Sequence, residues 1–94
     1  MPAYFIAEID VKEPELYAQY VEKATPIVES FGGRYIFRSE SIHTVSGNWS
    51  PGRMIMIEFE NKEMIFECFS SDEYLEIAPL REGSTQSRSI IVEC

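Results

Sequence analysis

The sequence has little positive charge, few cysteines and a single histidine. Eight lysines and arginines stand against sixteen aspartates and glutamates, so the formal net charge is −8. A field of this sign repels the phosphates of nucleic acids and of anionic membrane surfaces, and we expect neither as a partner. An anionic small molecule is still possible as a ligand, because local charge can oppose the net charge.

Long apolar runs are also absent. No stretch approaches the roughly 18 uninterrupted apolar residues of a membrane span. Residues 1–4 contain neither the basic nor the apolar part of a signal peptide, so we predict a cytoplasmic protein. Cys68 and Cys94 match no metal-ligand spacing and no disulfide framework. We therefore expect two free thiols in a reducing compartment, and no metal.

The 94 residues have the length and the patterning of a single α+β domain spanning residues 1–94. Alternating apolar residues predict strands over residues 3–11, 34–46, 53–60 and 88–93. Apolar residues at helical spacing predict a first helix that starts at Pro14 and ends at Gly32-Gly33.

Two further helices are predicted after the third strand. Asn61 can cap the first of them. Ser70-Ser71-Asp72 predicts a break and a new cap, which starts a second, short helix that ends before Pro79. The resulting order β-α-β-β-α-β is the ferredoxin-like pattern. It predicts one antiparallel sheet with the helices on one face.

Side chains of a strand alternate between the two faces of a sheet, so each strand can be divided by parity. The odd positions are almost wholly apolar, and we expect the helices to cover them. The even positions mix apolar and charged groups: Tyr4, Ile6, Glu8, Ile36, Arg38, Glu40, Met54, Met56, Glu58, Arg88, Ile90 and Val92. So much apolar surface is typical of an interface or a ligand groove. It predicts a homodimer formed through this face.

Several segments resemble a known family. They are residues 3–11 with Pro14 and Tyr17, Gly32-Gly33-Arg34-Tyr35 with Arg38, Gly47-Asn48-Trp49 and Pro51-Gly52-Arg53, Glu58-Phe59, residues 70–74, and Pro79-Leu80-Arg81. In these segments, which span essentially the whole chain, the sequence resembles the family filed as domain of unknown function 1330.

The resemblance implies a dimeric α/β barrel of ferredoxin-like subunits. That superfamily includes antibiotic-biosynthesis-type monooxygenases and muconolactone isomerases, and members of it act on reactive aromatic or enolic compounds without metal or flavin. The resemblance therefore implies no cofactor, and it supplies no catalytic residue to carry over.

Glu8, Arg38, Glu58 and Arg88 share the even face and are the first site candidates. A carboxylate whose pKa is raised by burial could move protons, and an arginine could hold a carboxylate or an enolate. The alternative is two buried ion pairs that fix the orientation of the dimer.

Trp49 and Tyr74 complete the candidate pocket residues. Trp49 either caps a pocket, reaches across to the partner subunit or packs over the hairpin, whereas Tyr74 either projects toward a cavity mouth or packs in the core. The spacing of Tyr17 and Tyr20 favours the core. His43 is the only histidine, and we expect it at an edge or on the surface.

Two functions remain open at this point. The first is a cofactor-free protein that binds or transforms a small enolic, aromatic or carboxylate molecule, with its site between the even sheet face and the helices. The second is a non-catalytic dimerisation or interaction module whose even face is consumed by association. A role with nucleic acid is disfavoured, because Tyr4 is the one aromatic on the even face and the net charge has the wrong sign.

Overall fold

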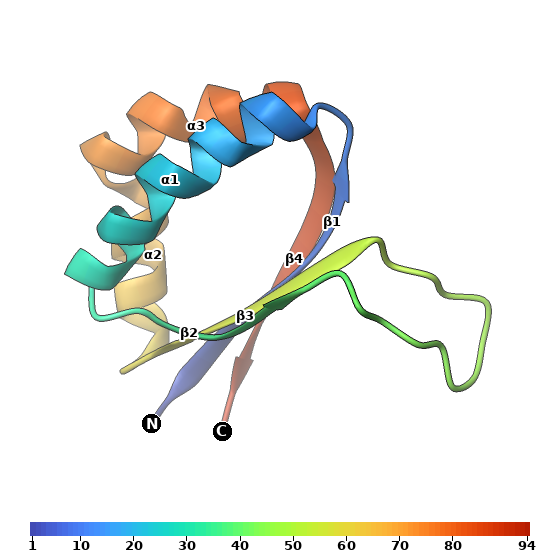
Figure 1. Ribbon diagram of the computed structural model, residues 1–94. Coiled ribbons are helices and arrows are strands. Elements are labelled where there is room, and N and C mark those ends of the chain that lie inside the picture. Colours follow the sequence, from blue (N-terminus) through green and yellow to red (C-terminus); the bar gives the residue numbers. More distant parts are fainter.

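The elements follow one another in the predicted order in a computed structural model that describes all residues, 1–94. They are β1 (Ala3–Val11), α1 (Pro14–Ser30), β2 (Arg34–Ser39), β3 (Arg53–Phe59), α2 (Lys62–Ser70), α3 (Asp72–Ser84) and β4 (Thr85–Glu93). The strands form one antiparallel sheet in the order β2-β3-β1-β4, and all three helices lie on one side of it (Figure 1). The fold is ferredoxin-like, as predicted. None of the helices has the length and apolar content that crossing a bilayer requires.

Local signals set the starts of the helices. Pro14 begins α1. The backbone N–H groups of the first turn have no acceptor within the helix, so proline, which lacks this group, costs no hydrogen bond there. The side chain of Asn61 accepts a hydrogen bond from the backbone N–H of Met64 at 2.9 Å and caps α2. Ser71 accepts from the backbone N–H of Tyr74 at 3.2 Å and caps α3. The predicted break between α2 and α3 is thereby confirmed.

The predicted end of α3 is wrong, because the helix continues through Pro79 to Ser84. Proline removes one backbone hydrogen bond, and the carbonyl that loses its donor belongs to Leu75. Pro79 and Leu75 are both exposed, so water can supply the missing bond. The extra turn brings Arg81 onto the helix.

The second strand is shorter than predicted. β2 ends at Ser39, where the Ser39 hydroxyl accepts a hydrogen bond from the backbone N–H of Ser41 at 3.0 Å. Residues 40–52 form a loop that projects from the body of the molecule (Figure 1). β4, by contrast, begins at Thr85, three residues before the predicted position 88.

A bulge interrupts β2. Tyr35 pairs with Ile57 of β3, but the next pair is Phe37 with Met56, so Ile36 is one extra residue in the strand. Such an insertion moves every later side chain of the strand to the opposite face. Strict alternation therefore holds only for the first half of β2.

The bulge corrects the predicted placement of Arg38. Arg38 pairs with Ile55 and lies on the helix side of the sheet, away from Glu8, Glu58 and Arg88. Its predicted place beside them was wrong, because no residue in the sequence marks the inserted position.

Outside the bulged part of β2, the two faces of the sheet differ as the alternation of the sequence predicts. The covered face carries the buried strand residues Ala3, Ala7, Ile9, Ile57 and Phe59, against buried helix residues such as Val28, Ile65 and Ile77. We call the other side the open face: Tyr4, Ile6, Glu8, Arg34, Phe37, Met54, Met56, Glu58, Arg88, Ile90 and Val92. Nothing in the chain covers it fully, and Ile90 is 60% exposed.

Candidate functional site

Glu58 on the open face is held by an arginine and a tyrosine. It accepts hydrogen bonds from Arg34 at 2.5 Å and from the Tyr4 hydroxyl at 3.0 Å, and both donors are its direct cross-strand partners. These bonds, the one from Arg34 foremost, hold the pKa of Glu58 below its ordinary value. The carboxylate is therefore an ion-pair member near neutral pH.

Glu8 is held in the same way by an arginine and a tryptophan. It accepts hydrogen bonds from the Trp49 indole at 2.6 Å and from Arg88, its cross-strand partner. The bond from Trp49, followed by the one from Arg88, lowers the pKa of Glu8. The upward shift needed for a proton-transferring carboxylate is thus absent. Trp49 also borders a depression of about 350 Å³ on the open face.

A partly enclosed cavity lies on the other side of the sheet, between the covered face and helices α1 and α3. We call it the inner cavity. Seventeen residues line it, 13 of them hydrophobic, and Tyr17, Tyr20, Tyr35 and Tyr74 are among them. Its volume is about 40 Å³, which is room for a few water molecules.

A wider space, the outer groove, opens between β4 and helices α2 and α3. Its volume is about 570 Å³, and 9 of its 13 lining residues are hydrophobic. Phe5, Phe69, Tyr74, Arg81 and Ser89 line both spaces. The two spaces therefore meet at these five residues.

Two tyrosines from different helices meet inside the cavity. The hydroxyl oxygens of Tyr20 and Tyr74 lie 2.8 Å apart and share one hydrogen bond. One of the two hydroxyls donates, so the hydrogen of the other is free for a further acceptor. Burial raises the pKa of Tyr20 well above its ordinary value, so this phenol stays neutral and can act as a donor.

Arg81 of α3 stands where the two spaces meet. Its Nε atom is buried and has no hydrogen-bond partner. Glu82, the one carboxylate within reach, lies 3.9 Å from Nη2, which is too long for a hydrogen bond. The positive charge of Arg81 also lowers the pKa of Tyr20, an effect smaller than that of burial.

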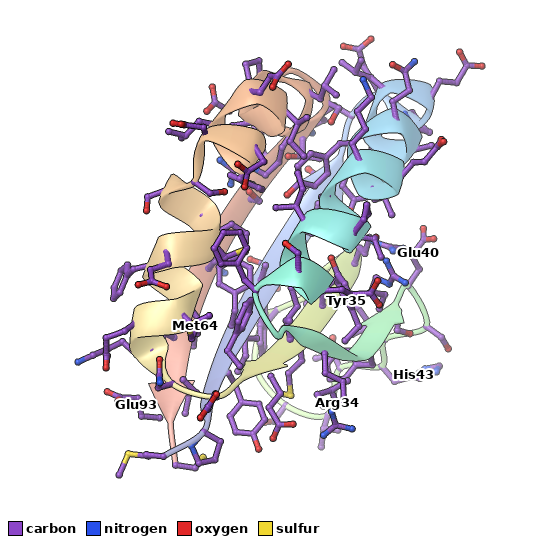
Figure 2. The ribbon with its side chains drawn as sticks, turned by 90° about the vertical axis from the view of Figure 1, so that its left-hand side faces the viewer. Arg34, Tyr35, Glu40, His43, Met64 and Glu93 are labelled. Atoms are coloured by element: carbon purple, nitrogen blue, oxygen red, sulfur yellow. The ribbon has the colours of Figure 1, made fainter.

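Arg38 reaches the inner cavity from β2, at the opposite edge of the sheet from β4. It donates a hydrogen bond to Thr25 Oγ1 at 3.1 Å, and its guanidinium carbon lies 4.1 Å from the centre of the Tyr35 ring. Tyr35 points toward α1, whereas Arg34 points away from the helices (Figure 2). Because of the bulge, Arg34 and Arg38 of the same short strand lie on opposite faces of the sheet.

The charge of the inner cavity opposes the net charge of the chain. Arg38 and Arg81 are its charged lining residues, and no carboxylate or imidazole lines it. Glu82 lines only the outer groove. The site can therefore donate hydrogen bonds to an anion or to a developing enolate, but it offers no ordinary general base.

The remaining predicted residues are dispersed. Tyr74 lines both the inner cavity and the outer groove, whereas Trp49 belongs to the open face. His43 is exposed on the projecting loop, on the side away from the helices α2 and α3 (Figure 2). No group of three or more histidine, cysteine or acidic side chains is arranged to hold a metal ion.

Sequence reasoning missed Tyr20 and Arg81 as site residues. Arg81 continues the spacing of Tyr74, Ile77 and Ala78, which are buried on the inner side of α3. A charged residue on the apolar stripe of a helix is the signal that could have identified it. Tyr20 lies on the stripe of α1, where a tyrosine in a core and one in a cavity look alike.

Comparison with known families identifies the chain. The family model described as Domain of unknown function (DUF1330) matches residues 2–94. The chain belongs to this family. No curated protein matches the sequence.

Several solved structures share the fold of this chain. The RPA0582 protein of unknown function from Rhodopseudomonas palustris is 17% identical, with a TM-score of 0.86 over 99% of this chain and 82% of that one. SnoaB, a cofactor-independent oxygenase from Streptomyces nogalater, is 7% identical, with a TM-score of 0.74 over 99% and 92%. A dimeric ferredoxin-like protein of unknown function from Jannaschia sp. CCS1 is 9% identical, with a TM-score of 0.69 over the full length of both.

Proposed function

We propose that the protein binds a small enolic, aromatic or carboxylate molecule, without a cofactor, in the inner cavity and outer groove. The observation that carries this proposal is the apolar, tyrosine-lined cavity with two arginines and no carboxylate in its wall. A mostly apolar concave site with a few convergent polar groups is the usual form of a small-molecule site.

The chemistry available in this site is hydrogen-bond donation. Arg81 and the Tyr20–Tyr74 pair would stabilise negative charge on a bound oxygen, as in the enolate form of a carbonyl compound. The shared fold of SnoaB, a cofactor-independent oxygenase, supports a site that needs no cofactor. Because fold alone does not fix function, the test has to be made on this site.

Filling the site tests the proposal. Ser89 lies at the junction of the two spaces, and Ser89→Trp would place a large ring there; Ser46→Trp, on the projecting loop, is the matched control. In the wild-type protein and the control, cinnamate should shift NMR signals of amides around the cavity. Ser89→Trp, folded by circular dichroism, should weaken these shifts. Shifts confined to the open face, or none at millimolar cinnamate, would contradict the proposal.

We also propose that the protein is a homodimer through the open face. This surface carries exposed Ile90, Val92 and Phe37 next to the two glutamate–arginine pairs. A continuous apolar surface with embedded ion pairs is typical of a self-association interface, and the pairs would fix its register. The dimeric ferredoxin-like protein of the same fold supports this arrangement.

The proposed dimer interface and the proposed ligand site lie on opposite faces of the sheet. The sequence alone places both on the even face, whereas the inner cavity lies on the covered side of the sheet. A dimer could therefore use the whole open face and leave the cavity accessible. The ion pairs of Glu8 and Glu58 belong to the interface proposal, and Tyr74 with Arg38 belongs to the ligand proposal.

A charge placed on the open face tests the dimer. Met56 lies opposite Ile6 in the middle of that face, and Met56→Glu should shift the mass measured by light scattering from two chains to one. Phe66→Glu, a change of an exposed apolar residue on α2, is the control and should leave the mass unchanged. A wild-type protein that is monomeric at high concentration would contradict the proposal.

A further inference from the structure

Arg81 has the position of a recognition residue for the ligand of the proposed site. It lines both the inner cavity and the outer groove, so a molecule that lies across their junction would be next to the Arg81 guanidinium. Its backbone belongs to α3, and its carbonyl accepts hydrogen bonds from the hydroxyls of Ser84 at 3.4 Å and of Thr85, the first residue of β4, at 2.7 Å. The side chain is thus held at the junction from a rigid element.

Two hydrogen-bond donors at this place are not used by the protein. One is the buried Nε of Arg81, and the other is the free hydrogen of the Tyr20–Tyr74 pair. A buried donor without a partner is costly, and buried polar groups in folded proteins are nearly always paired. An acceptor supplied by a ligand would remove this cost.

The two arginines of the inner cavity differ in this respect. Arg38 already donates to Thr25 and stacks on Tyr35, and it is exposed to water. Arg81 has no comparable partner, and its nearest carboxylate, Glu82, is outside hydrogen-bond distance. The anchoring role therefore falls to Arg81.

The volumes of the two spaces indicate which part of a ligand each can hold. The inner cavity of about 40 Å³ has room for a small head group, whereas the outer groove of about 570 Å³ has room for a ring system. Phe66, Phe69 and Leu75 give the groove apolar walls. Conjugated aromatic acids combine these two properties in one planar molecule.

From this geometry we infer that the ligand is an aromatic carboxylate, with its carboxylate at Arg81 and the Tyr20–Tyr74 pair and its ring in the outer groove. The inference rests on the proposed function and deepens it. An Arg–carboxylate contact in a partly dry site is among the stronger hydrogen-bonding arrangements in proteins. An aromatic amide of the same shape would lack the charge that Arg81 needs.

Calorimetric titration with cinnamate and its neutral isostere cinnamamide tests the inference. The wild-type protein should bind cinnamate at least about tenfold more tightly than cinnamamide, because a hydrogen-bonded charge pair is replaced by a neutral contact. Arg81→Gln should remove this preference, and Arg81→Lys should restore part of it. Lys23→Gln removes one positive charge from an exposed position of α1 that lines neither space; it is the control and should keep the preference.

Each outcome separates the two proposals. If the wild-type protein binds both compounds equally well, the inference that the ligand is a carboxylate is wrong, whereas the proposed ligand site is still supported. A preference that survives in Arg81→Gln, or one that is lost in Lys23→Gln, would overturn the role of Arg81. Binding of neither compound, in a protein shown to be folded by circular dichroism, would count against the site itself.

Discussion

The hydroxyl groups of Tyr20 and Tyr74 lie 2.8 Å apart and join α1 to α3 above the sheet. The rings meet edge to face, with their centres 6.2 Å apart. This contact is the one side-chain hydrogen bond between the two helices, and it lies in the wall of the inner cavity. It therefore serves the packing of the helices and the polarity of the cavity together.

Removing either hydroxyl should destabilise the fold by a similar amount. Tyr20→Phe and Tyr74→Phe are each expected to lower the free energy of unfolding by about 1 kcal/mol, because each leaves a buried hydroxyl unpaired. The double variant should cost less than the sum of the two, since it leaves no orphan. Urea unfolding followed by circular dichroism measures all four proteins. Additive losses would show that the hydroxyls are not coupled.

Acid should weaken the protein through the open-face glutamates. The pKa values of Glu8 and Glu58 are lower in the folded chain than the ordinary value of 4.5, so the unfolded chain binds protons first as the pH falls. Their stabilising contribution is complete above the unfolded pKa and is lost as the pH falls through the folded pKa. In Glu58→Gln, the free energy of unfolding should therefore fall less steeply between about pH 5 and pH 3 than in the wild-type protein.

A matched variant gives the control for this experiment. Glu76 is exposed on α3 and takes part in no ion pair, so Glu76→Gln should leave the pH dependence of unfolding unchanged. An identical slope in Glu58→Gln and the wild-type protein would contradict the assignment of the acid transition to the Arg34–Glu58 pair.

Gly33 tests the packing beneath α1. A Cβ atom at this position would lie 2.5 Å from Val28 Cγ1 and 2.9 Å from both the Val28 carbonyl oxygen and Phe59 Cζ. Gly33→Ala should therefore lower the free energy of unfolding by about 1–3 kcal/mol, as overpacking of a core does. Gly52→Ala, whose Cβ would have its nearest neighbour at 3.7 Å, should change it by less than about 0.5 kcal/mol. Equal effects would contradict this packing.

The two thiols should differ sharply in reactivity. Cys68 is fully buried, and burial raises its pKa to about 11, so only about one thousandth of it is thiolate at pH 8. Cys94 is exposed. Ellman's reagent at pH 8 should therefore modify one thiol rapidly in the native protein and both after denaturation. Native Cys94→Ser should react very slowly; rapid reaction would show that Cys68 is accessible.

Burial made much of the fold predictable. Phe5, Ala7 and Ile9 alternate with residues of the open face such as Ile6 and Glu8, and only one register of β1 buries the first set under the helices. Asn61 and Ser71 mark helix starts because their side chains pair with backbone donors of the first turn. These are local or one-dimensional signals, and they can be found in the sequence.

The candidate site depended on facts that are not local. The bulge at Ile36 has no glycine or proline to announce it, so Arg38 was predicted on the wrong face. The extension of α3 past Pro79 needed the knowledge that the freed carbonyl faces water, and without it Arg81 was not placed on a helix. The inner cavity arises from how α1, α3 and the sheet pack, and no single segment encodes it.

The bulge also makes the two edges of the sheet unequal. β2 and β4 are the outer strands, and each carries a row of backbone groups without a neighbouring strand. At Ile36 the row on β2 loses its regular spacing, whereas β4 has nine residues in unbroken register with β1. A further strand can pair only with such a regular row, and a bulge in an edge strand hinders this pairing. Unwanted extension of the sheet by another chain, and hence aggregation, is therefore expected to begin at β4.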